Sequence, residues 1–169
     1  MNPIFIGELN PYGGHPHYAL YDKPSTSAGG RLRRKVLAVR SETYLRCTRY
    51  NLCDGKWNMA AARARAHEIL VRHSSSERPH DPLVLLGRKV VNAFFGGPDG
   101  EDPLPEPFTL RSCRYSVYGG STTEREPPNV LILPHPSGLC CEWHAAGAFG
   151  RARAMMREFV PSFPVGEAL

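Results

Sequence analysis

Long apolar runs are missing from this 169-residue chain, which has no stretch of about 18 consecutive apolar residues. A membrane-spanning helix needs a run of about that length, so no transmembrane segment is predicted. The first eight residues also lack the basic flank and long apolar stretch of a signal peptide. Apolar residues still make up 41% of the chain. This share predicts one globular domain with its own core over residues 1–169.

The cysteines form no C-x-x-C pair, and their number is odd. The five are Cys47, Cys53, Cys113, Cys140 and Cys141. This pattern predicts neither a zinc ribbon nor a disulfide framework. Reduced thiols in a cytoplasm are the simpler interpretation, so we expect a cytoplasmic protein without a metal or cofactor.

Lysine is scarce: 17 of the 21 basic residues are arginine. The net charge of the chain is +5. Guanidinium groups match phosphate oxygens, and a basic surface attracts polyanions such as nucleic acid. Arg31, Arg33 and Arg34 stand together with Lys35. They are candidate DNA contacts; a solvated helix face is the alternative.

Short apolar runs at residues 4–6, 83–86 and 130–133 predict buried strands. Residues 44–52 alternate loosely, and residues 109–118 have strand character. No internal repeat is visible.

Helices are expected between these strands. They are predicted over residues 30–39 with Ser27 as cap, 59–73 with Asn58 as cap, 88–95, and 143–159. The alternation predicts an α/β fold: a three-layer sandwich with a central, mostly parallel sheet of four or five strands.

In such sheets ligands bind outside the carboxyl ends of the strands. The first strand runs into residues 7–13, G-E-L-N-P-Y-G. This predicted loop offers the carboxylate of Glu8, the amide of Asn10, a rigid turn at Pro11 and the ring of Tyr12. A Pro/Gly turn with solvated polar groups is the alternative.

The last strand runs into residues 133–139, L-P-H-P-S-G-L. His135 lies between Pro134 and Pro136, which restrict the backbone on both sides. A rigid histidine at the carboxyl end of a strand can present a proton donor. A surface turn with an incidental histidine is the alternative.

These two motifs, in this order, resemble those of the uracil-DNA glycosylase superfamily. That family has G-x-D/N-P-Y/G or G-E-x-P-G after its first strand, and H-P-S or N-P-S-G after its last. Residues 50–53, Y-N-L-C, resemble its internal strand, whose asparagine contacts the pyrimidine edge. Residues 83–95 resemble its strand–glycine–helix unit, so the resemblance extends over most of the chain.

The chain departs from the family at three points. The first motif has one residue more than usual between Gly7 and Pro11. The four cysteines of the iron–sulfur subfamilies are not found. Residues 139–143, L-C-C-E-W, match no uracil specificity.

The resemblance implies a uracil-DNA glycosylase-like fold and a monomeric DNA glycosylase. Such an enzyme hydrolyses the N-glycosidic bond of uracil or a modified pyrimidine that has flipped out of the DNA. His135 would then stabilise the negative charge on the departing base. Glu8 would activate the water, or Asn10 would orient it, and the extra residue leaves this choice open.

Further residues take roles by the same resemblance. Asn51 would pair with the pyrimidine edge, or it ties two loops together. Leu139 would wedge into the DNA, or it is an ordinary packed leucine. Tyr12 and Tyr18 would stack on the base, or they belong to core or surface. The remaining substrate-binding candidates are Gly7, Pro11, Ser137 and Gly138.

Other interpretations remain. His15 and His17 with His135 would resemble a zinc site, but spacing fixes no third ligand, so no metal is predicted. The alternatives to a DNA glycosylase are an enzyme for free nucleotides and a non-catalytic DNA- or base-binding protein. The base, the strand preference and the setting (repair, defence or viral DNA modification) stay open.

Overall fold

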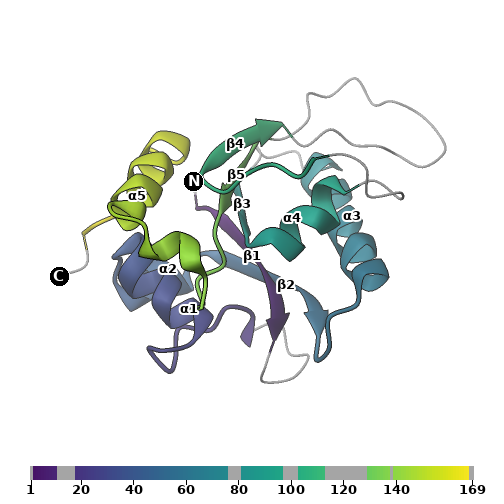
Figure 1. Cartoon of the computed structure of the whole chain (residues 1–169), viewed down its shortest axis with the longest axis horizontal. Coiled ribbons are helices and arrows are strands. Elements are labelled where there is room, and N and C mark those ends of the chain that lie inside the picture. The colour runs from purple at the N-terminus through teal and green to yellow at the C-terminus, as the bar shows by residue number, and fades with distance from the viewer. Residues whose placement is uncertain are drawn as a thin grey trace.

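In the computed structural model, five strands form one sheet in the order β2-β1-β3-β5-β4 (Figure 1). The structure describes residues 2–10, 18–75, 81–96, 103–112, 129–137 and 139–167. The strands are β1 (Ile4–Asn10), β2 (Thr48–Asp54), β3 (Leu83–Leu86), β4 (Thr109–Ser112) and β5 (Asn129–Leu133). Four of them are parallel, and only β4 runs antiparallel, against β5. The prediction of an α/β fold with a mostly parallel sheet is confirmed.

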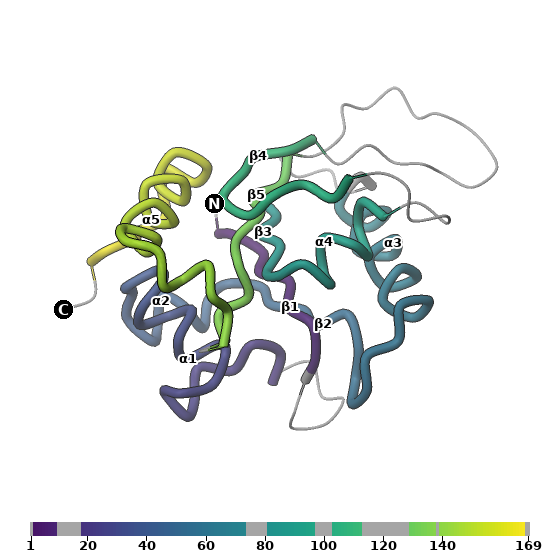
Figure 2. Tube along the Cα trace, viewed as in Figure 1, coloured from purple at the N-terminus to yellow at the C-terminus, as the bar shows by residue number. Residues whose placement is uncertain are grey.

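Helices cover both faces of this sheet (Figures 1 and 2). One face carries α1 (Ala28–Arg31), the π-helix η2 (Leu32–Leu37), α2 (Ser41–Leu45) and α5 (Ala148–Phe159). The other carries α3 (Met59–Ser75) and α4 (Arg88–Phe95). Among the described residues, no helix has the length and apolar character needed to cross a bilayer.

The central strands are buried on both faces, which explains their unbroken apolar sequences. In β3, Leu83 and Leu85 pack into the core beneath α3 and α4. Val84 and Leu86 pack into the core on the side of α5. Two separate cores therefore hold the sheet in the middle layer.

Local sequence signals account for two of the helix starts. The side chain of Asn58 accepts a hydrogen bond from the backbone N–H of Ala61 at 2.9 Å, which caps α3. Ser27 caps α1 by accepting from Gly30 N–H at 3.0 Å. Glycine is needed at position 29, since a Cβ there would lie 2.0 Å from the carbonyl oxygen of Leu20.

Several predicted boundaries were wrong. The helix expected over 30–39 is the short α1 followed by η2, and residues 44–52 are divided between α2 and β2. The last helix does not begin at Trp143, which lies in the separate 3-10 helix η3 (Cys141–His144). Of the strand expected over 109–118, residues 109–112 form β4, and the rest lies outside the described residues.

The first strand is longer than predicted. Residues 7–10 were expected to form a loop, but β1 continues through them because β2 pairs with it as far as Asn10↔Asp54. Gly7 and Glu8 are therefore held by sheet backbone rather than by a turn. Strand geometry makes successive side chains point to opposite faces of the sheet.

Candidate functional site

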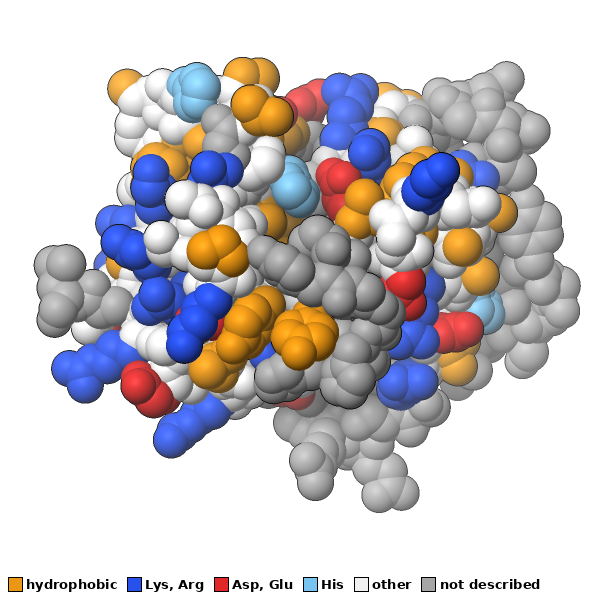
Figure 3. Space-filling model, turned by 90° about the horizontal axis from the view of Figure 1, so that it is seen from below, with side chains coloured by type: hydrophobic (Ala, Val, Ile, Leu, Met, Phe, Trp, Pro, Cys, Tyr) orange, Lys and Arg blue, Asp and Glu red, His pale blue; other side chains and the backbone are white. Residues whose placement is uncertain are grey.

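A cavity of about 490 Å³ opens beside the carboxyl ends of β1, β3 and β5. Figure 3 looks onto this face of the molecule. Glu8 of β1 and His135 after β5 both line the cavity, as does Gly87, the residue that ends β3. The backbone N–H of Gly87 donates to the carbonyl of Leu133 at 2.9 Å, which ties the ends of β3 and β5 together.

Gly87 is the point where the two chemical groups meet. A Cβ atom on it would lie 2.8 Å from Cβ of His135 and 3.2 Å from Oε1 of Glu8. Its φ of +96° lies in the region that favours glycine. The absence of a side chain at position 87 thus lets a carboxylate and an imidazole converge.

The imidazole of His135 has a defined proton position. The backbone N–H of Ser137 donates to its Nδ1 at 3.3 Å. Since Nδ1 accepts, the proton of the neutral ring lies on Nε2, which is then a hydrogen-bond donor. Burial lowers the pKa of His135 below its ordinary value; the Glu8 carboxylate opposes this shift and the Lys89 ammonium adds to it. The structure therefore favours a neutral imidazole at neutral pH.

Trp143 fixes the backbone of the same residue. Its indole N–H donates to the carbonyl of His135 at 2.8 Å. The indole ring is buried, stacks on Phe149 at 5.1 Å between centroids, and meets the edge of Phe108 at 5.6 Å. This aromatic cluster anchors the His135 loop to α5 and to the segment before β4.

Glu8 forms an ion pair inside the cavity. Its Oε2 lies 3.4 Å from Nζ of Lys89, in the first turn of α4. The Lys89 ammonium lies 5.6 Å from the ring centroid of Trp57, which steadies the long side chain. The Glu8 side chain is mostly buried, whereas Lys89 is half exposed.

Cys140 and Glu142 line the cavity, and the exposed Cys141 lies next to them. Both Cys140 and Cys141 donate to Oε2 of Glu142, at 2.9 and 3.4 Å. These bonds hold the pKa of Glu142 below its ordinary value, and the bond from Cys140 is the largest cause of this shift. Burial is the main cause that raises the pKa of Cys140 to about 12. Cys140 is therefore protonated at neutral pH and is no thiolate nucleophile.

Asn51 lies on the opposite side of β1. It pairs in register with Gly7, and its Oδ1 is 2.6 Å from where a Cβ on Gly7 would stand. Both amide atoms of Asn51 are buried without a hydrogen-bond partner among the described residues. Neither Asn51 nor Gly7 lines the cavity, so the structure does not bring them together with Glu8 and His135 there.

Leu139 is 95% exposed, which is far more than the other large apolar side chains that the structure describes. It lines the mouth of the cavity together with Ser137. A leucine side chain this exposed does not contribute to the hydrophobic core of the free protein.

Several of the predicted site residues lie away from the cavity or outside the residues that the structure describes. Tyr18 is 40% exposed, packs edge-to-face on Tyr21 at 5.8 Å, and does not line the cavity. The residues that the structure does not describe include five of the candidates: Pro11, Tyr12, His15, His17 and Gly138. The side chain of Asn10 is also not described.

Arg33 differs from the phosphate contact predicted for it. Its Nε lies 3.1 Å from the buried carboxylate of Asp22, so it acts as an internal partner. Arg34 is exposed and Arg31 is partly exposed. Figure 3 shows basic side chains over the half of this face formed by α1, α2 and α5, and further ones, mixed with acidic side chains, over the other half.

Sequence reasoning missed three residues of the site. Gly87 and Lys89 follow an apolar run, so the rule for carboxyl ends would have found them. Trp143 gave no comparable signal, because its role depends on a contact between segments. In the described part of the chain, no three His, Cys, Asp or Glu side chains are grouped as metal ligands.

Comparison with protein-family models, with curated proteins and with solved structures finds no match to this chain.

Proposed function

We propose that this protein is a DNA glycosylase that hydrolyses the N-glycosidic bond of uracil or a modified pyrimidine. The observation that carries the proposal is the convergence of Glu8 and His135 over Gly87, in one cavity at the carboxyl ends of the strands. Support also comes from the order of the motifs that contain these two residues.

Cleavage of an N-glycosidic bond leaves negative charge on the departing base and positive charge on the sugar. His135 donates Nε2–H to a carbonyl oxygen of the base as that charge develops. A neutral donor held by Ser137 and Trp143 needs little reorganisation, which is the basis of oxyanion stabilisation.

Glu8 serves the sugar side of the reaction. Its carboxylate takes a proton from the attacking water and favours the cationic, oxocarbenium-like sugar. Asn10, two residues further along β1, is the alternative water-orienting group, as it can hold water but not accept its proton.

Asn51 recognises the base. Its carbonyl and amide, which have no partner among the described residues, match the N3–H donor and O4 acceptor of a uracil-like pyrimidine. Guanine offers the same pair at N1–H and O6, so the choice of a pyrimidine rests on the resemblance of residues 50–53 to the family's internal strand.

Leu139 enters the DNA as the base leaves the stack. An exposed apolar side chain at the cavity mouth suits a wedge that fills the gap left by a flipped nucleotide. Phosphate contacts come from arginines such as the partly exposed Arg31 and the exposed Arg34.

The test is a screen of single- and double-stranded DNAs, each with one modified base, scored for released base and abasic sites under single-turnover conditions. On the best substrate, His135→Ala should lower the rate about a hundredfold, or ~3 kcal/mol, with DNA affinity largely kept. If Glu8 activates the water, Glu8→Gln should slow base release more than Asn10→Ala does.

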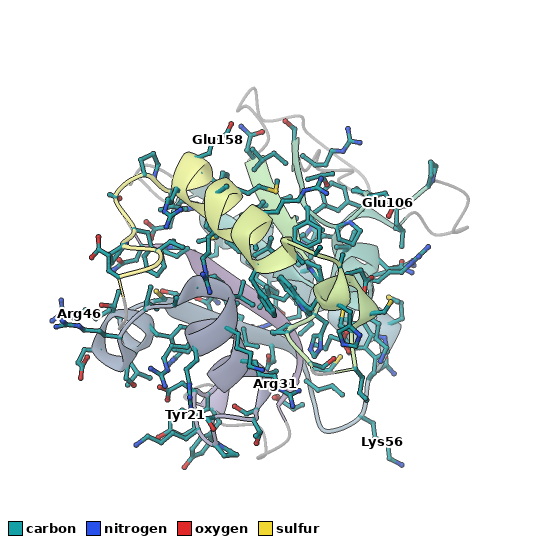
Figure 4. The ribbon with its side chains drawn as sticks, turned by 60° about the vertical axis from the view of Figure 1, so that its left-hand side comes forward. Tyr21, Arg31, Arg46, Lys56, Glu106 and Glu158 are labelled. Atoms are coloured by element: carbon teal, nitrogen blue, oxygen red, sulfur yellow. The ribbon has the colours of Figure 1, made fainter. Side chains whose placement is uncertain are left out.

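Two matched controls keep the result interpretable. His144→Ala and Glu158→Gln change an exposed histidine and an exposed carboxylate that do not line the cavity, and both should retain activity. Figure 4 shows Glu158 on the outer side of α5. Normal base release by a folded His135→Ala protein would refute the proposed role. Activity of the wild-type protein on free nucleotides but not on DNA would indicate a nucleotide hydrolase. Binding of DNA without release of a base would indicate a non-catalytic protein.

A further inference from the structure

We propose that Lys89 is an amine nucleophile that forms a Schiff base with the abasic deoxyribose and thereby gives this protein an abasic-site lyase activity. The inference rests on the proposed function, because it places the sugar of that reaction in the same cavity. It adds a second reaction that hydrolysis by Glu8 and His135 does not require.

The position of Lys89 carries the proposal. The chain has only four lysines, Lys23, Lys35, Lys56 and Lys89. Of these, Lys89 is the one that lines the cavity. Its Nζ lies 3.4 Å from Oε2 of Glu8, and the ring of Trp57 limits its freedom. An amine thus stands next to the carboxylate that would face C1′ of the sugar.

Stability does not explain a lysine at this position. Lys89 lies in the first turn of α4, where no acidic residue is present and Gly87 provides no side-chain cap. A cation at the N-terminus of a helix opposes the helix dipole. Because Lys89 is half exposed, its ion pair with Glu8 adds little to folding. The placement is better explained by chemistry in the cavity.

Each step of the reaction balances with the groups present. Lys89 passes a proton to Glu8, and the free amine attacks C1′ of the ring-opened sugar, forming a C–N bond. Glu8 returns the proton to the C1′ oxygen and then relays a second proton to it from the attached nitrogen, so the oxygen leaves as water and an iminium remains. The Glu8 carboxylate then takes a proton from C2′. The released electron pair forms the C2′–C3′ double bond and expels the 3′-phosphate, and water later hydrolyses the iminium.

The experiment uses the full chain with preformed abasic DNA and sodium borohydride, which reduces an iminium to a stable amine. Wild-type protein should form a covalent protein–DNA complex, and peptide mass mapping should locate the adduct on Lys89. Lys89→Arg keeps the positive charge beside Glu8 but should lose the complex. Lys56→Arg is the matched control, since Figure 4 shows Lys56 directed away from the body of the protein.

The outcomes separate this inference from the proposed function. A complex mapped to Lys89 supports the inference even if every base-release assay is negative. Absence of a complex, equal yield with Lys89→Arg, or an adduct on another amine overturns it. Base release without a Lys89 adduct would leave a hydrolytic glycosylase. Mapping in the wild-type protein also decides the matter if Lys89→Arg does not fold.

Discussion

At the scale of single residues, the site depends on a glycine that brings two reactive groups together. Gly87 combines a φ of +96° with closely placed neighbours from β1 and from the loop after β5. The backbone of β3 therefore turns away without occupying the space between Glu8 and His135.

Gly87→Ala should damage both stability and activity. Alanine is strained at this φ, at a cost of about 1–3 kcal/mol, and its Cβ would press on His135. Thermal unfolding and single-turnover base release measure the two effects. Gly55→Ala is the control, because position 55 also has positive φ but nothing within 4 Å of its added Cβ. Equal effects of both variants would contradict the proposed close approach.

The protonation of His135 predicts a pH dependence of stability. Its pKa is lowered in the folded protein, chiefly by burial, so the unfolded chain binds the proton more readily. The stabilising contribution is complete above about pH 6.5, the ordinary value for histidine, and is lost as the pH falls toward the folded-state value. Protonation at Nδ1 would also break the bond from Ser137 N–H.

The measurement compares urea unfolding of wild-type protein and His135→Gln between neutral and mildly acidic pH. The stability difference between them should shift against the wild type as the pH falls. A difference independent of pH would mean that the imidazole does not titrate differently in the folded and unfolded states. His144→Gln, which changes an exposed histidine, serves as control.

At the scale of elements, α3 is specified by its own sequence. Asn58 caps its N-terminus, and one side of the helix packs into the core through small and branched side chains. Asn58→Ala should cost about 1 kcal/mol of folding free energy, measured by urea unfolding. Asn58→Asp retains the capping oxygen and should cost less. No loss in Asn58→Ala would mean that the cap adds nothing to the packing of α3.

The sequence predicted elements best where local signals and burial agree. The apolar run at 83–86, the glycine after it and the helix over 88–95 have the predicted bounds. Elements that depend on distant contacts were predicted less well. Pairing with β2 extends β1 beyond Ile6, and contacts of Trp143 with Phe108 and Phe149 accompany the separation of η3 from α5.

The candidate site was predictable to a similar degree. His135 and Glu8 followed from motifs at the ends of strands. Gly87 and Lys89 follow the end of a buried strand, so the same rule would have found them, whereas the indole bond from Trp143 required the fold. The contact of Trp143 with His135 joins two segments that are separated by a turn, so no spacing rule predicts it from the sequence.

At the scale of the whole molecule, charge should control association with DNA. The net charge is +5, and basic side chains are exposed on both halves of the strand-end face, including the half formed by α1, α2 and α5 (Figure 3). If phosphates bind there, DNA affinity should fall steeply with added salt. Fluorescence anisotropy at several salt concentrations measures the slope, and a salt-independent affinity would favour a small-molecule substrate.

Two neighbouring arginines should have different roles, one in DNA binding and the other in the stability of the fold. Arg34→Ala should weaken binding to all DNA sequences alike and reduce the salt slope, with stability unchanged. Arg33→Ala should instead destabilise the fold by about 3 kcal/mol, because the buried Asp22 loses its cation. Unfolding and anisotropy on both variants check this division. A stable Arg33→Ala protein with impaired DNA binding would return Arg33 to the DNA surface.

The unequal lengths of β1 and β3 have a consequence for exchange with solvent. Pairing of β1 with β3 ends at Ile6↔Leu85, whereas pairing with β2 continues to Asn10↔Asp54. Beyond Ile6, β1 is therefore bordered on one side only, and the interior of the sheet contains a short edge beside Glu8. Backbone amides there should exchange hydrogen for deuterium faster than those of residues 4–6. If the proposed substrate binds in the cavity and covers this edge, these amides should exchange more slowly in its presence, even in a variant that does not release the base.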